Sequence, residues 1–293
     1  MKKPLFKGAA TALVTPFSGG KIDIEALKKL TEFQISEGID ALVVCGTTGE
    51  APTLSKKEKI EITATVAEVA NGRVPIIAGT TCNDTASSVE LSKEAVRVGA
   101  DGILAVTPYY NRPGASGLLR HFLTIAEGAG VPTILYNIPS RTGTDIPESV
   151  YDGFASHPMA AGVKEASGSI SKCAYIASKY GADLPLYSGN DDMTLPVLAI
   201  GGYGVISVVS NMFPRQMAEL CKLYEADREE CKKLYHRFSP LMRSLFTETN
   251  PMPIKSGMEK LGLCRHELRL PLTRASAKCE ETLFAEIERF LML

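Results

Sequence analysis

Short apolar runs alternate with amphipathic stretches along most of this chain of 293 residues. Each run ends in a polar or Gly/Pro cluster, and the segment after it carries apolar residues at helical spacing. The runs are apolar throughout, which is typical of parallel strands that are buried on both faces. The predicted strands lie at 8–17, 41–48, 75–81, 102–110, 132–139, 161–167, 184–190 and 204–211.

Eight consecutive strand–helix units predict a (β/α)₈ barrel, that is, a TIM barrel of the α/β class. A doubly wound sheet is the alternative, but it usually has fewer strands, and no G-x-G-x-x-G follows the first strand. The strand rhythm stops after about residue 212, and a helical pattern follows. We therefore predict a catalytic barrel over 1–224 and a C-terminal helical domain over 225–293. Four prolines are expected to break that domain's helices: Pro240, Pro251, Pro253 and Pro271.

Helix signals stand where this architecture needs them. Residues 24–38 carry apolar residues at helical spacing and close on Gly38. Ser55 with Glu58 forms a capping-box pattern, and Asp84 is placed to cap the next helix.

Composition narrows the classes of protein. The net charge of −1 gives no global field for nucleic acid or an anionic membrane, and no run of about 18 apolar residues predicts a membrane span. Seven cysteines without a C-x-x-C pair indicate reduced thiols in a cytoplasmic protein, with neither a disulfide framework nor a zinc site. The four histidines are scattered, and no cofactor motif is present, so we expect neither a metal nor a cofactor.

The start of the chain partly resembles a signal peptide, because a basic start precedes an apolar stretch. Lys7 and Gly8 interrupt that stretch, Pro16 ends it, and no A-x-A cleavage site follows. We interpret it as the first buried strand.

Lys164 is the most informative single residue, because it interrupts the short apolar strand GVKEA. In a TIM barrel the active site lies where the strands end. A lysine that points into the barrel is desolvated, which favours the neutral amine that can attack a carbonyl and form a Schiff base. The pattern alone leaves open the alternative that Lys164 faces outward and pairs with a carboxylate.

Three other polar residues fall at strand ends. Tyr136 can either pack its ring in the core or move protons beside a neutral lysine. Thr47 offers a short hydroxyl in the stretch GTTGE, which is either an ordinary turn or a cradle for an anion. Arg141 is either a surface arginine or a planar fork for a carboxylate. At one barrel mouth, they suggest carbonyl chemistry on a small carboxylated substrate.

Six motifs together resemble the dihydrodipicolinate synthase family, within the pyruvate-dependent class I aldolases that include N-acetylneuraminate lyase. The resemblance covers almost the whole chain, from ALVTPF near the start to LRLPLT at 268–273. Each motif stands at its own strand end and in the family's order. They are GTTGE (46–50), TPYYNRP (107–113), YNIPSRTG (136–143), GVKEASG (162–168), YSGND (187–191) and GVISV (204–208).

The resemblance implies a lyase that condenses pyruvate with L-aspartate 4-semialdehyde through a Schiff base, in the diaminopimelate and lysine pathway. It implies that Lys164 forms the Schiff base, that Tyr136 is the acid/base residue, and that Thr47 links Tyr136 to Tyr110 from a neighbouring subunit. It gives substrate-binding roles to Thr48, at the pyruvate carboxylate, to Arg141, at the semialdehyde carboxylate, and to the main chain of Gly189 and Ile206. GTTGE would then be both a strand end and a carboxylate cradle.

Two alternatives to this reading remain. Sugar-acid aldolases share the lysine, the tyrosine and the barrel, but they resemble GSTGE where this chain has GTTGE, and they lack an arginine at the place of Arg141. The other alternative is a catalytically silent homologue, which usually loses Lys164 or Tyr136. The family's usual state implies a homotetramer built as a dimer of dimers, which the sequence does not separate from a plain dimer.

One departure from the family bears on regulation. Lysine-inhibited members carry histidines where this chain has Lys56 and Lys59, and a glutamate where it has Ser87. Added cations and a lost anion should repel cationic lysine. We expect weak or absent inhibition by L-lysine, although Asn83 and Tyr109 match the lysine-inhibited members.

Overall fold

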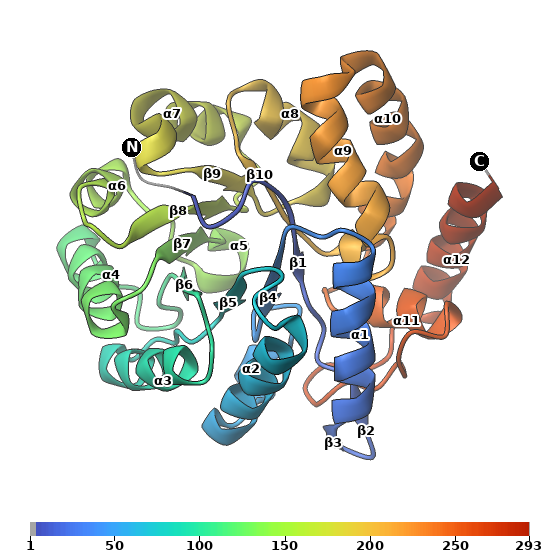
Figure 1. The fold of residues 1–293 in the computed structure, drawn as a ribbon, viewed down its shortest axis with the longest axis horizontal. Coiled ribbons are helices and arrows are strands. Elements are labelled where there is room, and N and C mark those ends of the chain that lie inside the picture. Colours follow the sequence, from blue (N-terminus) through green and yellow to red (C-terminus); the bar gives the residue numbers. More distant parts are fainter. Residues whose placement is uncertain (1–3, 293) are drawn as a thin grey trace.

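A computed structural model describes residues 4–292 of the chain. Its eight parallel strands close into one barrel, in the order β1, β4, β5, β6, β7, β8, β9, β10 and back to β1 (Figure 1). Each strand begins within two residues of its predicted start, so the predicted TIM barrel is confirmed. The strands are β1 Gly8–Ala12, β4 Ala41–Val44, β5 Ile76–Ala78, β6 Gly102–Val106, β7 Thr133–Asn137, β8 Ala160–Glu165, β9 Leu186–Ser188 and β10 Gly204–Ser207.

Helices surround the barrel as an outer ring (Figure 1). Asp84 caps α3, and Ser55 with Glu58 forms a complete capping box at α2, as the sequence predicts. The helices of the ring are α1 Ile24–Ser36, α2 Lys56–Ala70, α3 Thr85–Arg97, α4 Ala115–Ala129, α6 Glu148–Ala155, α7 Ile170–Tyr180, α8 Thr194–Ala199 and α9 Pro214–Ala226. The four-residue helix α5 Pro139–Thr142 follows β7 and lies inside this ring (Figure 1). Short 3₁₀ turns are η1 Ala51–Thr53, η2 Gly181–Asp183, η3 Asp191–Met193 and η4 Val209–Asn211.

After α9, the chain forms three further helices on one side of the barrel, which are drawn in orange and red in Figure 1. They are α10 Arg228–Ser244, α11 Met252–Lys260 and α12 Ala277–Met292. Helix α10 contacts both α9 and α12, and α11 contacts α12. The division into 1–224 and 225–293 stays a prediction, and α9 runs across it to Ala226.

One proline prediction is wrong. Pro240 lies inside α10 and does not end it, although a proline in a helix interior usually costs about 3 kcal/mol. The helix continues because Phe238, Leu241 and Met242 beside the proline are fully buried in the main hydrophobic cluster. Packing of this face offsets the lost hydrogen bond. Pro251 and Pro253, by contrast, stand at the start of α11, where proline is tolerated.

A small hairpin was not predicted. Strands β2 Phe17–Ser18 and β3 Lys21–Ile22 pair antiparallel across Gly19 and Gly20, which both have positive φ. The Gly-Gly pair between short strands is the signal that would have found it. The Glu267 carboxylate accepts hydrogen bonds from both glycine N–H groups, at 3.0 and 2.5 Å. The hairpin is thereby tied to the C-terminal part of the chain.

Apolar side chains fill the barrel interior and the space between strands and helices. Inside, Phe6 stacks on Tyr187 with ring centres 4.3 Å apart, and the tyrosine hydroxyl donates to the Phe6 carbonyl. Where β10 meets β1, a side chain at Gly204 would come within 1.8 Å of the Gly8 carbonyl oxygen. Only glycine allows this close approach of the two backbones.

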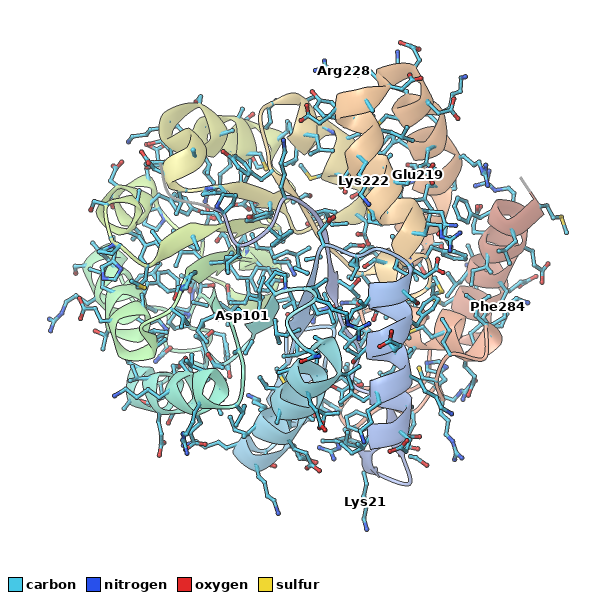
Figure 2. All side chains as sticks on the ribbon, viewed as in Figure 1. Lys21, Asp101, Glu219, Lys222, Arg228 and Phe284 are labelled. Carbon is cyan, nitrogen blue, oxygen red and sulfur yellow. The ribbon has the colours of Figure 1, made fainter. Side chains whose placement is uncertain are left out.

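Most charged side chains lie on the outside. Figure 2 shows Lys21 and Arg228 projecting from opposite edges of the molecule, while Glu219 and Lys222 lie on α9. Such a mixed surface agrees with the net charge of −1. The polar groups that matter for chemistry are those at the strand ends.

His121 on α4 gives the fold a pH dependence. Its Nδ1 lies 2.8 Å from the Thr85 hydroxyl at the start of α3, and its Nε2 has no hydrogen-bond partner among the described residues. Burial lowers the pKa of His121 to about 4, with Asp84 acting weakly in the opposite direction. The native state therefore holds a neutral imidazole, while the unfolded chain takes up a proton below about pH 6.5.

Stability is accordingly expected to fall as the pH drops from 6.5 towards 4, with a share from His121 of roughly 2 kcal/mol at pH 5. His121→Gln should make the free energy of unfolding flatter between pH 7 and 5, as measured by urea titration. His236→Gln, on the exposed face of α10, is the matched control and should leave the slope unchanged. An unchanged slope in His121→Gln would contradict the assignment.

Candidate active site

Strands β7 and β8 bring Lys164 and Tyr136 together. The two residues are paired in register, and the Lys164 Nζ lies 4.3 Å from the centre of the Tyr136 ring. Lys164 is 5% exposed and Tyr136 is 4% exposed. Among the described residues, no carboxylate forms an ion pair with Lys164. The structure therefore places the lysine inside the barrel mouth and not on the outer face.

A cavity of about 430 Å³ opens above this pair. It brings together most of the predicted site residues, including Lys164, Tyr136 and Arg141. A wall from the C-terminal helical segment, residues 246–250, closes one side, which the sequence did not predict. The lining residues are Thr47, Thr48, Tyr136, Ile138, Ser140, Arg141, Lys164, Ala166, Gly189, Asn190, Val208, Phe246, Thr247, Glu248, Thr249 and Asn250.

A second cavity of about 290 Å³ adjoins the first. Thr47, Tyr136 and Arg141 line both of them. The second cavity also contains Lys59 and Tyr109, two of the residues on which the regulatory expectation rests. A ligand in the second cavity would therefore contact Tyr136 and Thr47, which also line the first cavity.

The GTTGE loop turns sharply at the end of β4. Cys45 and Glu50 both adopt positive φ, and a side chain at Gly79 would come within 2.3 Å of the Cys45 carbonyl oxygen. Thr48, on this turn, lines the cavity, and its hydroxyl accepts a hydrogen bond of 3.0 Å from the Asn250 amide. Burial raises the pKa of the Cys45 thiol to about 12, so Cys45 is no nucleophile here.

Arg141 stands on the one-turn helix α5, directly after β7. Its Nη2 donates a 2.8 Å hydrogen bond to the Asn250 carbonyl, while the rest of the side chain is exposed. A guanidinium has five N–H donors, so several remain free to face a carboxylate in the cavity. The geometry suits an anion-binding fork.

Asn250 is the residue that sequence reasoning missed. It contacts both Thr48 and Arg141, and its own side-chain oxygen is buried without a hydrogen-bond partner in residues 4–292. A clue lay in the polar stretch TETN directly before two closely spaced prolines, in a region read only as helical. Its long separation from the barrel strands hid the contact.

Asp191, after β9, organises the loop that follows β10. Its buried carboxylate accepts hydrogen bonds from the backbone N–H groups of Val208, at 3.1 Å, and Val209, at 2.9 Å. Burial raises the pKa of this carboxyl, and these backbone contacts act against the rise. Asp191 thereby fixes Val208, which lines the cavity.

Two predicted residues lie apart from the cavity. Tyr110 is 92% exposed, with a φ of 70°, and it is not among the described lining residues of either cavity. Ile206 is fully buried in the interior cluster that also holds Tyr136, without lining either cavity. A single chain thus does not bring Tyr110 to Lys164.

Within residues 4–292, no group of three or more His, Cys, Asp or Glu side chains is arranged to hold a metal ion. Over the same residues, no helix is long and apolar enough to cross a bilayer. The described lining of the cavity offers an amine, a phenol and a guanidinium, together with several hydroxyls, two side-chain amides and the Glu248 carboxylate.

Comparison with known proteins gives consistent matches. The Dihydrodipicolinate synthetase family matches residues 5–290. A 4-hydroxy-tetrahydrodipicolinate synthase from Geobacter metallireducens is 43% identical over 290 residues, covering 99% of this chain and 100% of that protein.

Two solved structures are similar in fold along nearly their whole length. The 4-hydroxy-tetrahydrodipicolinate synthase from Methylacidiphilum fumariolicum SolV has a TM-score of 0.95 at 42% identity, covering 98% of this chain and 96% of that one. A dihydrodipicolinate synthase from Cyanidioschyzon merolae with lysine bound has a TM-score of 0.95 at 35% identity, covering 99% of this chain and 100% of that one.

Proposed function

Because the chain belongs to the dihydrodipicolinate synthetase family, we propose that it is a lyase that condenses pyruvate with L-aspartate 4-semialdehyde to 4-hydroxy-tetrahydrodipicolinate. The observation that carries the proposal is the buried Lys164 amine, 4.3 Å from the Tyr136 ring, at the floor of a cavity that also holds Arg141. A desolvated amine, a proton donor and an anion site are the groups that this reaction needs.

The reaction begins at the amine. Lys164 Nζ attacks the pyruvate carbonyl carbon, and Tyr136 passes protons as the carbinolamine loses water to give the imine. The Thr48 hydroxyl and backbone N–H hold the pyruvate carboxylate, beside Gly189, which lines the cavity. Loss of a methyl proton turns the imine into an enamine, the carbon nucleophile.

The second substrate then enters. The enamine carbon attacks the aldehyde carbon of the semialdehyde, whose carboxylate is held by Arg141. The imine to Lys164 forms again, and the aldehyde oxygen takes up a proton in place of the one that the methyl group lost and becomes a hydroxyl. The amino group of the semialdehyde next attacks the imine carbon, closes the ring and displaces the Lys164 amine. Lys164 thus returns unchanged to its starting state, and no cofactor is consumed.

The quaternary state is part of the same proposal. Tyr110 completes the proton relay through Thr47 from a neighbouring subunit, because in its own chain it is 92% exposed and is not among the described residues that line either cavity. The assembly is a homotetramer, a dimer of dimers, and sedimentation velocity on the purified chain tests this. The seven free cysteines support a cytoplasmic location, which a fractionation experiment can check.

The test is the condensation itself. Pyruvate and L-aspartate 4-semialdehyde are supplied with a coupled reductase, and NADPH loss is followed; N-acetylmannosamine and glyceraldehyde are tested separately by pyruvate consumption. Turnover with the semialdehyde supports the synthase. No turnover with the semialdehyde, together with pyruvate consumption in the presence of a sugar aldehyde, would make the chain a sugar-acid aldolase. No turnover with any of these aldehydes would make it a catalytically silent homologue.

Regulation by L-lysine is expected to be weak or absent. Lys59 lines the second cavity and has no ion-pair partner among the described residues, so its charge opposes a cationic ligand. The charge of Lys56 repels a cationic ligand less strongly, because Lys56 pairs with Glu90 at 2.6 Å. Activity should persist at millimolar L-lysine, and Lys59→His should increase the inhibition. Inhibition of the unaltered enzyme below millimolar L-lysine would contradict the expectation.

A further inference from the structure

A fully buried ion pair joins the GTTGE loop to the C-terminal helices. The Lys255 Nζ on α11 lies 2.5 Å from Glu50 Oε1, and both side chains are 0% exposed. The two residues are 205 positions apart in the chain. The ion pair therefore joins a distant segment of the chain to the loop that carries Thr47 and Thr48.

Both charged groups are held by further contacts. Lys255 also donates to the Glu267 carbonyl at 2.8 Å, and its Nζ lies 4.3 Å from the centre of the Phe17 ring. The second Glu50 oxygen accepts from the Arg269 backbone N–H at 3.0 Å. Burial lowers the pKa of Lys255, and the Glu50 carboxylate acts against that change. The carboxylate is thus fixed from two sides by the C-terminal segment.

Glu50 cannot move without moving the loop. It has left-handed backbone angles, with φ of 56° and ψ of 37°. Its N–H donates to the Thr47 carbonyl at 3.1 Å, so the turn that presents Thr47 and Thr48 closes on Glu50. Because the Glu50 side chain is held in place, the backbone of Thr47 and Thr48 is held in place with it.

Helix α11 also reaches the site by a second route. Asn250, just before the helix, donates to the Thr48 hydroxyl and accepts from Arg141. Lys255 and Asn250 therefore belong to one short segment that touches the loop at two points.

Net stability is a poor explanation for such a pair. Taking two charges out of water costs several kcal/mol per ion, and the attraction between them often only offsets that cost. A pair of this kind is better explained by the geometry that it imposes. We propose that Lys255 and Glu50 are positioning residues, through which the C-terminal helices hold Thr48 in place for the carboxylate of pyruvate. This inference rests on the proposed function, since it assigns Thr48 to that carboxylate.

The test separates positioning from simple structural support. Lys255→Met leaves an unpaired buried carboxylate, whereas Glu50→Gln/Lys255→Met removes both charges and retains an amide oxygen for the Arg269 N–H. Lys260→Met is the matched control, because Lys260 lies on the same helix and pairs with Glu288 at the surface, at 2.7 Å. Pyruvate binding is read as the pyruvate dependence of borohydride trapping on Lys164, and stability as the melting temperature.

The two readouts should diverge. In Lys255→Met, we expect a lower melting temperature and a half-saturating pyruvate concentration raised about tenfold. In the double variant, we expect the melting temperature to recover while the pyruvate requirement stays raised, with a maximal trapping rate within about threefold of wild type. Lys260→Met should match the wild type in both.

Recovery of pyruvate binding together with stability in the double variant would overturn the inference, because the pair would then be structural only. If Lys255→Met fails to fold, the comparison of pyruvate binding between the double variant and the wild type is the test. Failure of the proposed function gives a different result: the wild type itself would show no pyruvate adduct. A wild-type adduct with unaltered pyruvate binding in the double variant would sink the positioning role alone.

Discussion

Lys164→Ala is expected to abolish the pyruvate adduct and to lower the rate of condensation by more than about 10³-fold, which corresponds to about 4 kcal/mol of transition-state stabilisation. The reason is that the covalent path requires the amine at this position. Tyr136 and Arg141 can still bind and orient substrates, but they cannot form the imine. The loss should appear in kcat and in kcat/KM together.

The measurement is borohydride reduction in the presence of pyruvate, followed by intact-mass spectrometry, beside the coupled condensation assay. Lys179→Ala is the control, because Lys179 lies on the surface of α7, paired with Asp152 at 2.6 Å. It should retain both the adduct and the rate. Thermal melting checks that the loss of a side chain that is 95% buried has not unfolded the barrel. An adduct of undiminished yield in Lys164→Ala would contradict the mechanism.

The barrel could be predicted because each strand carries its own signal. Runs such as Ala41–Val44 are apolar on both faces, and only a parallel sheet covered by helices buries both faces. The same local reading went wrong at Pro240, where tertiary packing overrides the preference of the residue. It also passed over the hairpin at Gly19 and Gly20, which is too short to show a period.

The sequence predicts where the proposed catalytic pair lies, but not which way its lysine points. Strand-end positions put Lys164 and Tyr136 at the barrel mouth, but the inward direction of Lys164 depends on the strand register, which pairs the two residues across β7 and β8. No local pattern showed which distant segments are in contact. Asn250 and Lys255 meet the GTTGE loop across about 200 residues of chain, so only the fold reveals them.

Arg141→Ala should separate the two half-reactions. Pyruvate needs Lys164, Tyr136 and Thr48, so the variant is expected to form the pyruvate adduct at nearly the wild-type rate. Condensation with the semialdehyde should fall by roughly 10²-fold, because a charge-assisted hydrogen bond is worth about 1.5–3 kcal/mol and the guanidinium fork supplies more than one. Arg141→Lys should recover only part of the activity, since a lysine cannot reproduce the fork.

The position of Arg141 explains why the effect is specific to the second substrate. One of its nitrogens is committed to the Asn250 carbonyl, which orients the guanidinium, and the side chain remains exposed towards the cavity. Arg215→Ala, on α9 and paired with Glu37 at 2.9 Å, is the control and should match the wild type. Pyruvate trapping and semialdehyde turnover are measured on the same preparations. If both survive in Arg141→Ala, Arg141 is an ordinary loop arginine and does not hold the semialdehyde carboxylate.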